Sequence, residues 1–153
     1  MKNPEYAALL QSYRENKLLD VVEPDAESAA MYIDEAKYSM ELAARVFGDG
    51  RLAWASMAAY QAECYYMRAF LDKVGVSCGN ESSSIAAVKA SLGPEIADVI
   101  GRHKDICADD QVAQPAVGVK DILSEARKVV RVFEKCFSSG VEGHREFFEG
   151  AVE

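Results

Sequence analysis

The chain has 153 residues, half of them apolar, which is about one domain with enough apolar side chains for a core. Its 25 acidic and 17 basic residues give a formal charge of −8, which repels nucleic-acid phosphates and argues against broad, sequence-independent RNA or DNA binding. No apolar run approaches the ~20 residues of a membrane span, and no signal-peptide core follows Met1, so we expect a cytoplasmic protein.

The four cysteines are widely separated, with neither a CxxC pair nor the spacing of metal ligands. We expect reduced thiols, and Cys64 and Cys136 are predicted to pack as small apolar side chains within helices. A ferritin-like metal site needs Glu-x-x-His pairs on two helices, and neither histidine has a Glu at that spacing. No metal or other cofactor is therefore expected.

Apolar residues recur at three- and four-residue steps along most of the chain, which predicts helices. The first is expected over about 4–19. Pro24, followed by acidic residues, is typical of a helix start and predicts a second helix to about Phe47, where Gly48-Asp49-Gly50 ends it. Because this turn is short, the third helix, about Leu52–Val74, is expected to be its antiparallel neighbour.

Gly75 and the polar stretch 77–84 predict a loop whose serines cap a short helix to about Ser91. Another short helix is expected over 95–104, followed by a polar loop or helix start over 107–114. Pro115 is expected to open the last long helix, which ends near 137, and the tail 140–153 adds a short helix. No alternating pattern of useful length predicts a strand. The predicted fold class is all-α: an antiparallel up-down four-helix bundle with extra short helices.

Two of these segments resemble helices of the HEPN-domain family, small bundles found beside minimal nucleotidyltransferases. They are AAMYIDEAKYSMELAARVF (29–47) and the alanine- and aromatic-rich AAYQAECYYMRAFLDKVGV (58–76). The late helix 119–137, with Ala126-Arg127, is similar as well. The resemblance covers about 25–137, and it implies a single HEPN-like domain over 1–153, with helix 4–19 and tail 140–153 added to that core.

Many HEPN proteins are metal-independent endoribonucleases that use an Arg and, four to six residues later, a His for proton transfer and for stabilising the phosphorane charge. No arginine precedes His103 or His144 at that spacing, so we assign no catalytic residue. The resemblance then implies a non-catalytic homodimer that docks a nucleotidyltransferase, as in toxin–antitoxin pairs, and binds a nucleotide. Two alternatives stay open: a divergent HEPN ribonuclease using Arg102, His103 or Arg127, and a helical scaffold without a ligand.

Arg68, Tyr60 and Tyr65 are the candidate ligand site, because a guanidinium clamps a phosphate and a tyrosine ring stacks on a base. The other interpretation, in which the tyrosines fill the core and Arg68 pairs with a carboxylate, also stays open. Glu63 belongs to the same candidate site. A buried carboxylate needs a partner, and Arg68 is poorly placed five residues on, so we expect that partner on another helix.

Arg127, Lys128 and Arg131 form a basic stripe at helical spacing and are the candidate partner surface, although Glu125 and Glu134 can neutralise it. The basic run Arg102-His103-Lys104 is expected to be a solvated helix end.

Overall fold

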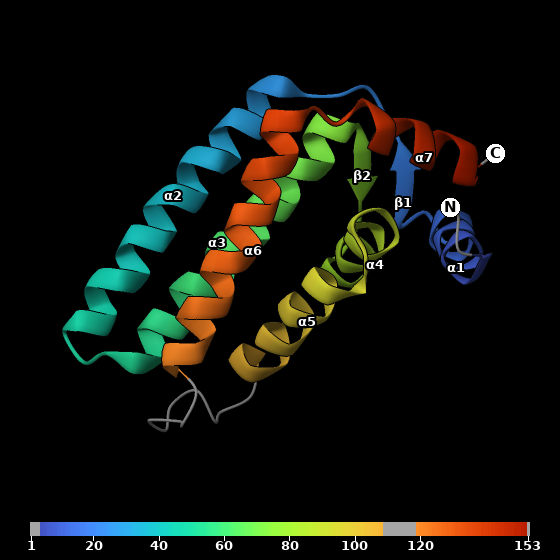
Figure 1. Ribbon diagram of the computed structural model, residues 1–153. Coiled ribbons are helices and arrows are strands. Elements are labelled where there is room, and N and C mark those ends of the chain that lie inside the picture. Colours follow the sequence, from blue (N-terminus) through green and yellow to red (C-terminus); the bar gives the residue numbers. More distant parts are fainter. Residues whose placement is uncertain (1–3, 109–118, 153) are drawn as a thin grey trace.

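The computed structural model describes residues 4–108 and 119–152, and helices dominate both ranges (Figure 1). The three longest are α2 (Ala26–Gly48), α3 (Leu52–Val74) and α6 (Val119–Ser139). The shorter ones are α1 (Pro4–Glu15), α4 (Glu81–Leu92), α5 (Pro94–Ala108) and α7 (Glu142–Val152). The all-α class is confirmed for these residues. Within them, no helix is long and apolar enough to cross a membrane.

Helices α2 and α3 form the antiparallel hairpin that the short turn predicts, and α3 has the predicted bounds. The Asp25 side chain caps α2 by accepting a hydrogen bond from the Ser28 N–H at 2.9 Å. Gly75 ends α3 in the left-handed conformation, with a φ of 86°, and its N–H donates to the Leu71 carbonyl at 2.8 Å. The two helices are lined with fully buried alanines: Ala29, Ala36, Ala43, Ala55, Ala59, Ala62 and Ala69.

Helix α3 is central, because α6 packs along it on the side shown at the front of Figure 1 and α5 packs beside α6. The core is aromatic: the rings of Phe70 and Phe133 lie 5.9 Å apart, and both are fully buried. Leu10 of α1 and Phe148 of α7 are fully buried in the same cluster, so both terminal helices contribute to this core.

A two-stranded antiparallel sheet joins β1 (Leu19–Val21) to β2 (Val76–Cys78), with Leu19 opposite Cys78. The expectation of no strand was wrong. Strands of three residues are too short to show alternation, and their pairing depends on helices that bring distant segments together.

The stretch 77–84 also differs from the predicted loop. Asn80, not a serine, caps α4, and it exchanges hydrogen bonds with Ser83 as a capping box. Helix α5 continues to Ala108, beyond its expected end near 104. Pro115, expected to open the last long helix, lies outside the described residues, as does the polar stretch 109–114.

Candidate functional site

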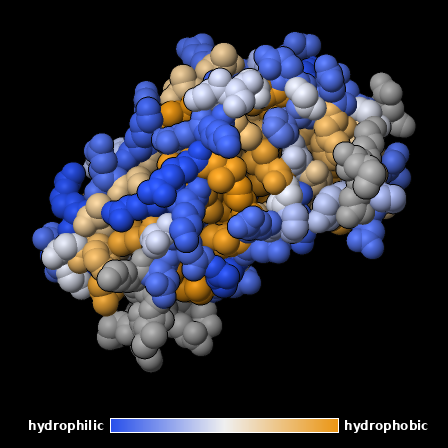
Figure 2. Space-filling model, viewed as in Figure 1, coloured by the Kyte–Doolittle hydropathy of each residue, from blue (hydrophilic) through white to orange (hydrophobic). Residues whose placement is uncertain are grey.

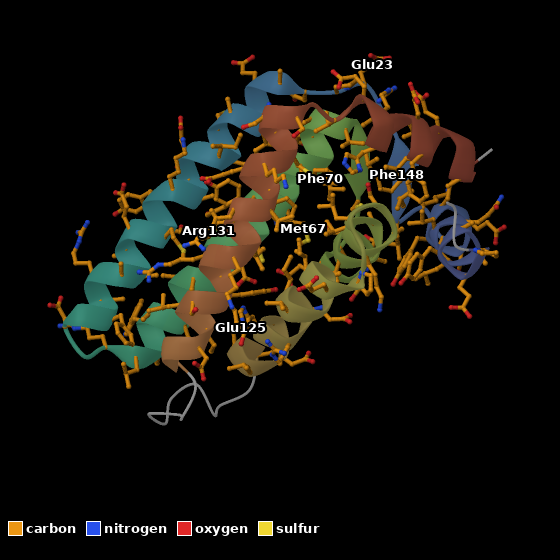
Figure 3. The ribbon with its side chains drawn as sticks, in the orientation of Figure 1. Glu23, Met67, Phe70, Glu125, Arg131 and Phe148 are labelled. Atoms are coloured by element: carbon orange, nitrogen blue, oxygen red, sulfur yellow. The ribbon has the colours of Figure 1, made fainter. Side chains whose placement is uncertain are left out.

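A groove of about 510 Å³ opens between the start of α2, the second half of α3 and the junction of β2 with α4. Figure 3 labels Glu23 on the connection that leads from β1 into α2, on one side of this groove. The charged and aromatic residues that line it are Glu23, Asp25, Tyr32, Arg68, Asp72 and Glu81.

The walls of the groove are fixed by hydrogen bonds between elements. The Asp25 N–H donates to the Asp72 carbonyl at 2.9 Å, and the Ser28 hydroxyl donates to the Asp72 carboxylate at 2.6 Å. The Val22 N–H donates to the Gly75 carbonyl at 2.8 Å. The groove is therefore formed before any ligand arrives.

Arg68 is exposed, and its guanidinium carbon lies 5.6 Å from the ring centroid of Tyr32, a cation–π contact. Tyr32 in turn stacks on Tyr65, with centroids 5.9 Å apart. No ion pair among the described residues includes Arg68. The structure thus brings Arg68 and Tyr65 together through Tyr32, which was not among the predicted site residues. The predicted hairpin held the signal, because residues about equally far from its turn face each other.

Among the described residues, four carboxylates and one guanidinium, that of Arg68, line the groove. These carboxylates repel a polyanionic ligand and attract a cationic one, and the walls of a groove strengthen such fields. The lining therefore suits a basic ligand better than a phosphate.

Tyr60 lies near the groove but does not line it. Its hydroxyl donates to the Glu81 carboxylate at 3.1 Å, which links α3 to the first turn of α4. Burial, together with Cys64 and Glu81, raises the pKa of the Tyr60 phenol above its ordinary value. Tyr60 is therefore a neutral hydrogen-bond donor in this structure.

Glu63 lies on another side of α3, because five residues turn a helix by about 140° from Arg68. Its Oε1 lies 2.6 Å from Nδ1 of His103 on α5, and both side chains are fully buried. The expected partner on another helix is confirmed, whereas the expectation that His103 belongs to a solvated helix end was wrong. Burial raises the pKa of Glu63, and the hydrogen bond and charge of His103 oppose that shift.

Two further residues extend this pair to α6. Glu125 Oε2 lies 3.3 Å from His103 Nε2, and the same carboxylate forms an ion pair with Arg102. The His103 contact has the distance of an ion pair but not the geometry of a hydrogen bond, and Glu63 Oε2 has no partner among the described groups. The cluster fastens three helices together, and its sealed imidazole is out of reach of an RNA substrate.

The basic stripe of Arg127, Lys128 and Arg131 is exposed on α6, where Figure 3 labels Arg131. Glu125 and Glu134, the two acidic residues expected to neutralise this stripe, instead interact with residues of other helices. Glu125 pairs with Arg102, and Glu134 accepts a hydrogen bond from the Tyr66 hydroxyl at 3.0 Å. In the part of the chain that the structure describes, no group of three or more His, Cys, Asp or Glu residues is arranged to hold a metal ion.

No family model matches the chain, and comparisons with curated proteins and with solved structures found no match.

Proposed function

We propose that the protein is a non-catalytic docking module of HEPN-like four-helix architecture, with α2, α3, α6 and the α4–α5 pair as its four helices. One observation carries this proposal: a preformed groove of about 510 Å³ whose described lining includes four carboxylates and one guanidinium. Such a preformed, charged groove is suited to the recognition of a ligand.

The ligand we propose is a basic segment of a protein partner, and the partner class is a nucleotidyltransferase. Lysine and arginine side chains complement the carboxylates of Glu23, Asp25, Asp72 and Glu81. The chain's formal charge of −8 steers a basic partner toward it.

A nucleotide is the second candidate, and the contact of Arg68 with Tyr32 and Tyr65 favours it. A guanidinium beside stacked rings is a workable site for a base and a phosphate. The four carboxylates that line the same groove make a nucleotide the weaker candidate, because its phosphates would meet like charges there.

The ribonuclease alternative is weaker still, because a general acid or base must reach the proton it transfers. His103 is fully buried against Glu63. The remaining alternative, a scaffold without a ligand, predicts that neither a basic peptide nor a nucleotide binds.

Two further surfaces belong to this proposal. The stripe of Arg127, Lys128 and Arg131 is proposed as a second contact, for acidic residues of the partner. The homodimer is proposed to use the exposed apolar side chains of the α2–α3 hairpin: Met31, Tyr38, Trp54 and Met57, each more than half exposed. Sedimentation of the wild type and of Trp54→Ser tests the dimer, and an unchanged mass contradicts this interface.

The groove is tested with two exposed glutamates, Glu23 in the groove and Glu41 away from it on α2. Glu23→Lys and Glu41→Lys change the net charge equally, so any difference in binding between the two variants cannot come from the overall charge of the protein. We expect Glu23→Lys alone to weaken binding of a labelled arginine-rich peptide, and to lose a nucleotidyltransferase recovered with the wild type from native extract. Equal effects of the two variants contradict the proposal.

A further inference from the structure

Three side chains from three helices converge where α6 ends and α7 begins. Ser91 Oγ of α4 lies 2.6 Å from Nδ1 of His144, and Cys136 Sγ of α6 lies 3.8 Å from Nε2 of the same ring. The chain turns between α6 and α7 at Gly140, whose φ of 90° is a conformation that glycine adopts without strain. A thiol, an imidazole and a hydroxyl thus stand in a row.

The imidazole is held in place but not sealed. The ring of Phe70 meets the His144 ring edge to face, with centroids 5.3 Å apart. Ser91, Cys136 and His144 are each half-buried, unlike the fully buried His103. Burial lowers the pKa of His144 and raises the pKa of the Cys136 thiol, so both groups are neutral near pH 7.

Cys136 packs against the apolar core cluster of the protein. Cys136 is on the same face of α6 as Val132 and Glu125, because steps of four and seven residues repeat along one side of a helix. Glu125 pairs with Arg102 of α5, so this face of α6 looks toward α5. Figure 2 shows apolar surface along the middle of the molecule, bordered by hydrophilic residues. Val99 and Val132 are among the half-buried apolar residues of α5 and α6.

We propose that Cys136 is a reactive thiol site for small, apolar α,β-unsaturated carbonyl compounds, with His144 as its general base and Ser91 as a positioning residue. His144 Nδ1–H donates to Ser91 Oγ, which leaves the Nε2 lone pair for the Cys136 thiol. As sulfur bonds to the β-carbon, its proton passes to Nε2 and the carbon–carbon π pair moves onto the carbonyl as an enolate. The imidazolium then returns the proton to the α-carbon, so the addition is balanced without a further reactant.

The other cysteines provide controls within the same chain. All four are free, and burial raises the pKa of Cys64, Cys78 and Cys107 to about 11. Cys78 is half-buried like Cys136, but its thiol neighbours Ser83 and Ser84 and no imidazole. Cys78 is therefore the matched control: it is about as exposed as Cys136 but has no neighbouring general base.

The test is the rate at which N-ethylmaleimide labels each cysteine in the native protein, resolved by peptide mapping. Near pH 7 we expect Cys136 to react at least ~100-fold faster than Cys78, the low end of what a positioned base contributes. Between about pH 6.5 and 8 the Cys136 rate is expected to stay nearly flat, whereas the Cys78 rate rises with its thiolate fraction.

His144→Phe keeps an aromatic ring against Phe70 and removes the base. We expect it to lower the Cys136 rate to that of Cys78 and to leave Cys78 unchanged. Equal rates for the two cysteines in the wild type, or a Cys136 rate that His144→Phe does not lower, overturn the proposal. If His144→Phe does not fold, Ser91→Ala decides: it keeps the ring, and an unchanged rate and pH profile of Cys136 also overturn the proposal.

Discussion

Glu63 and Arg68 lie five residues apart on α3, yet one is sealed in the protein and the other lines an open groove. Glu63 is fully buried against His103, whereas Arg68 is exposed over the Tyr32 ring and belongs to no ion pair among the described residues. The difference follows from which helix each side chain meets. Glu63 faces α5 and α6, while Arg68 lies at the edge facing the start of α2.

This contrast separates what holds the fold from what is free to bind. A buried charge is tied to its partner, because breaking the pair leaves an uncompensated ion in the interior. An exposed charge in a preformed groove has little to do for stability and is free for a ligand. The following changes test that division.

Replacing Glu63 is expected to have the largest effect. Glu63→Ala leaves His103 Nδ1 buried without its hydrogen-bond partner and is expected to lower the free energy of unfolding by about 3–5 kcal/mol, whereas Arg68→Ala changes it by less than about 1 kcal/mol. Urea unfolding measures both. Glu63→Gln keeps a hydrogen-bonding group and is expected to fall between them. If Glu63→Ala and Arg68→Ala lower the free energy of unfolding by similar amounts, the proposed difference between the two residues is wrong.

Substitution of Gly75, whose backbone helps to form the walls of the groove, is expected to lower the free energy of unfolding more than substitution of the exposed Arg68 in its lining. At Gly75, with its φ of 86°, an added Cβ would clash with the Val22 carbonyl oxygen and with the Arg145 guanidinium. We expect Gly75→Ala to cost about 1–3 kcal/mol of unfolding free energy. The control is Gly48→Ala, because a Cβ at this last residue of α2 meets nothing within 4 Å. Thermal unfolding measures both variants. If Gly75→Ala leaves the melting temperature unchanged, Gly75 is not required for the walls of the groove.

The pH dependence of stability follows from Glu63, whose pKa is raised by burial above its ordinary value of 4.5. The folded chain then holds the Glu63 proton more tightly than the unfolded chain. This stabilisation is complete below about pH 4.5 and is lost as the pH rises through the folded pKa. The groups around the carboxyl are His103 and Arg102 of α5, Glu125 of α6 and Cys107.

The measurement is the difference in unfolding free energy between wild type and Glu63→Gln across pH. We expect the wild type to lose stability relative to the variant as the pH rises. A difference that is constant, or that grows in favour of the wild type, means that burial does not dominate at Glu63.

The smallest effect is expected at Arg68, and its sign distinguishes the two ligand classes. If the ligand is basic, Arg68→Ala removes a like charge and strengthens binding of an arginine-rich peptide, by a free energy below about 1 kcal/mol because the site is exposed. If the ligand is a nucleotide, the same change removes the phosphate clamp and weakens binding. Fluorescence anisotropy for the peptide and calorimetry for ATP measure the two cases.

The hairpin could be predicted from the sequence because its signals are local. Gly48-Asp49-Gly50 and Gly75 end helices by backbone conformation alone, and α3 has the predicted bounds. The buried partner of Glu63 was also expected on another helix. His103 was not identified, because Arg102 and Lys104 beside it make the segment hydrophilic, and only tertiary packing turns the imidazole inward. The acidic groove was missed for the same reason, since its carboxylates come from separate segments.

The most direct test of the docking groove is a titration of the ¹⁵N-labelled protein with an arginine-rich peptide, followed by NMR. We expect the amide signals of groove residues such as Arg68, Gly79 and Glu81 to shift together, while that of His103 does not move. Shifts spread over the acidic surface, or confined to another face, would contradict it and show that the peptide is attracted by net charge alone.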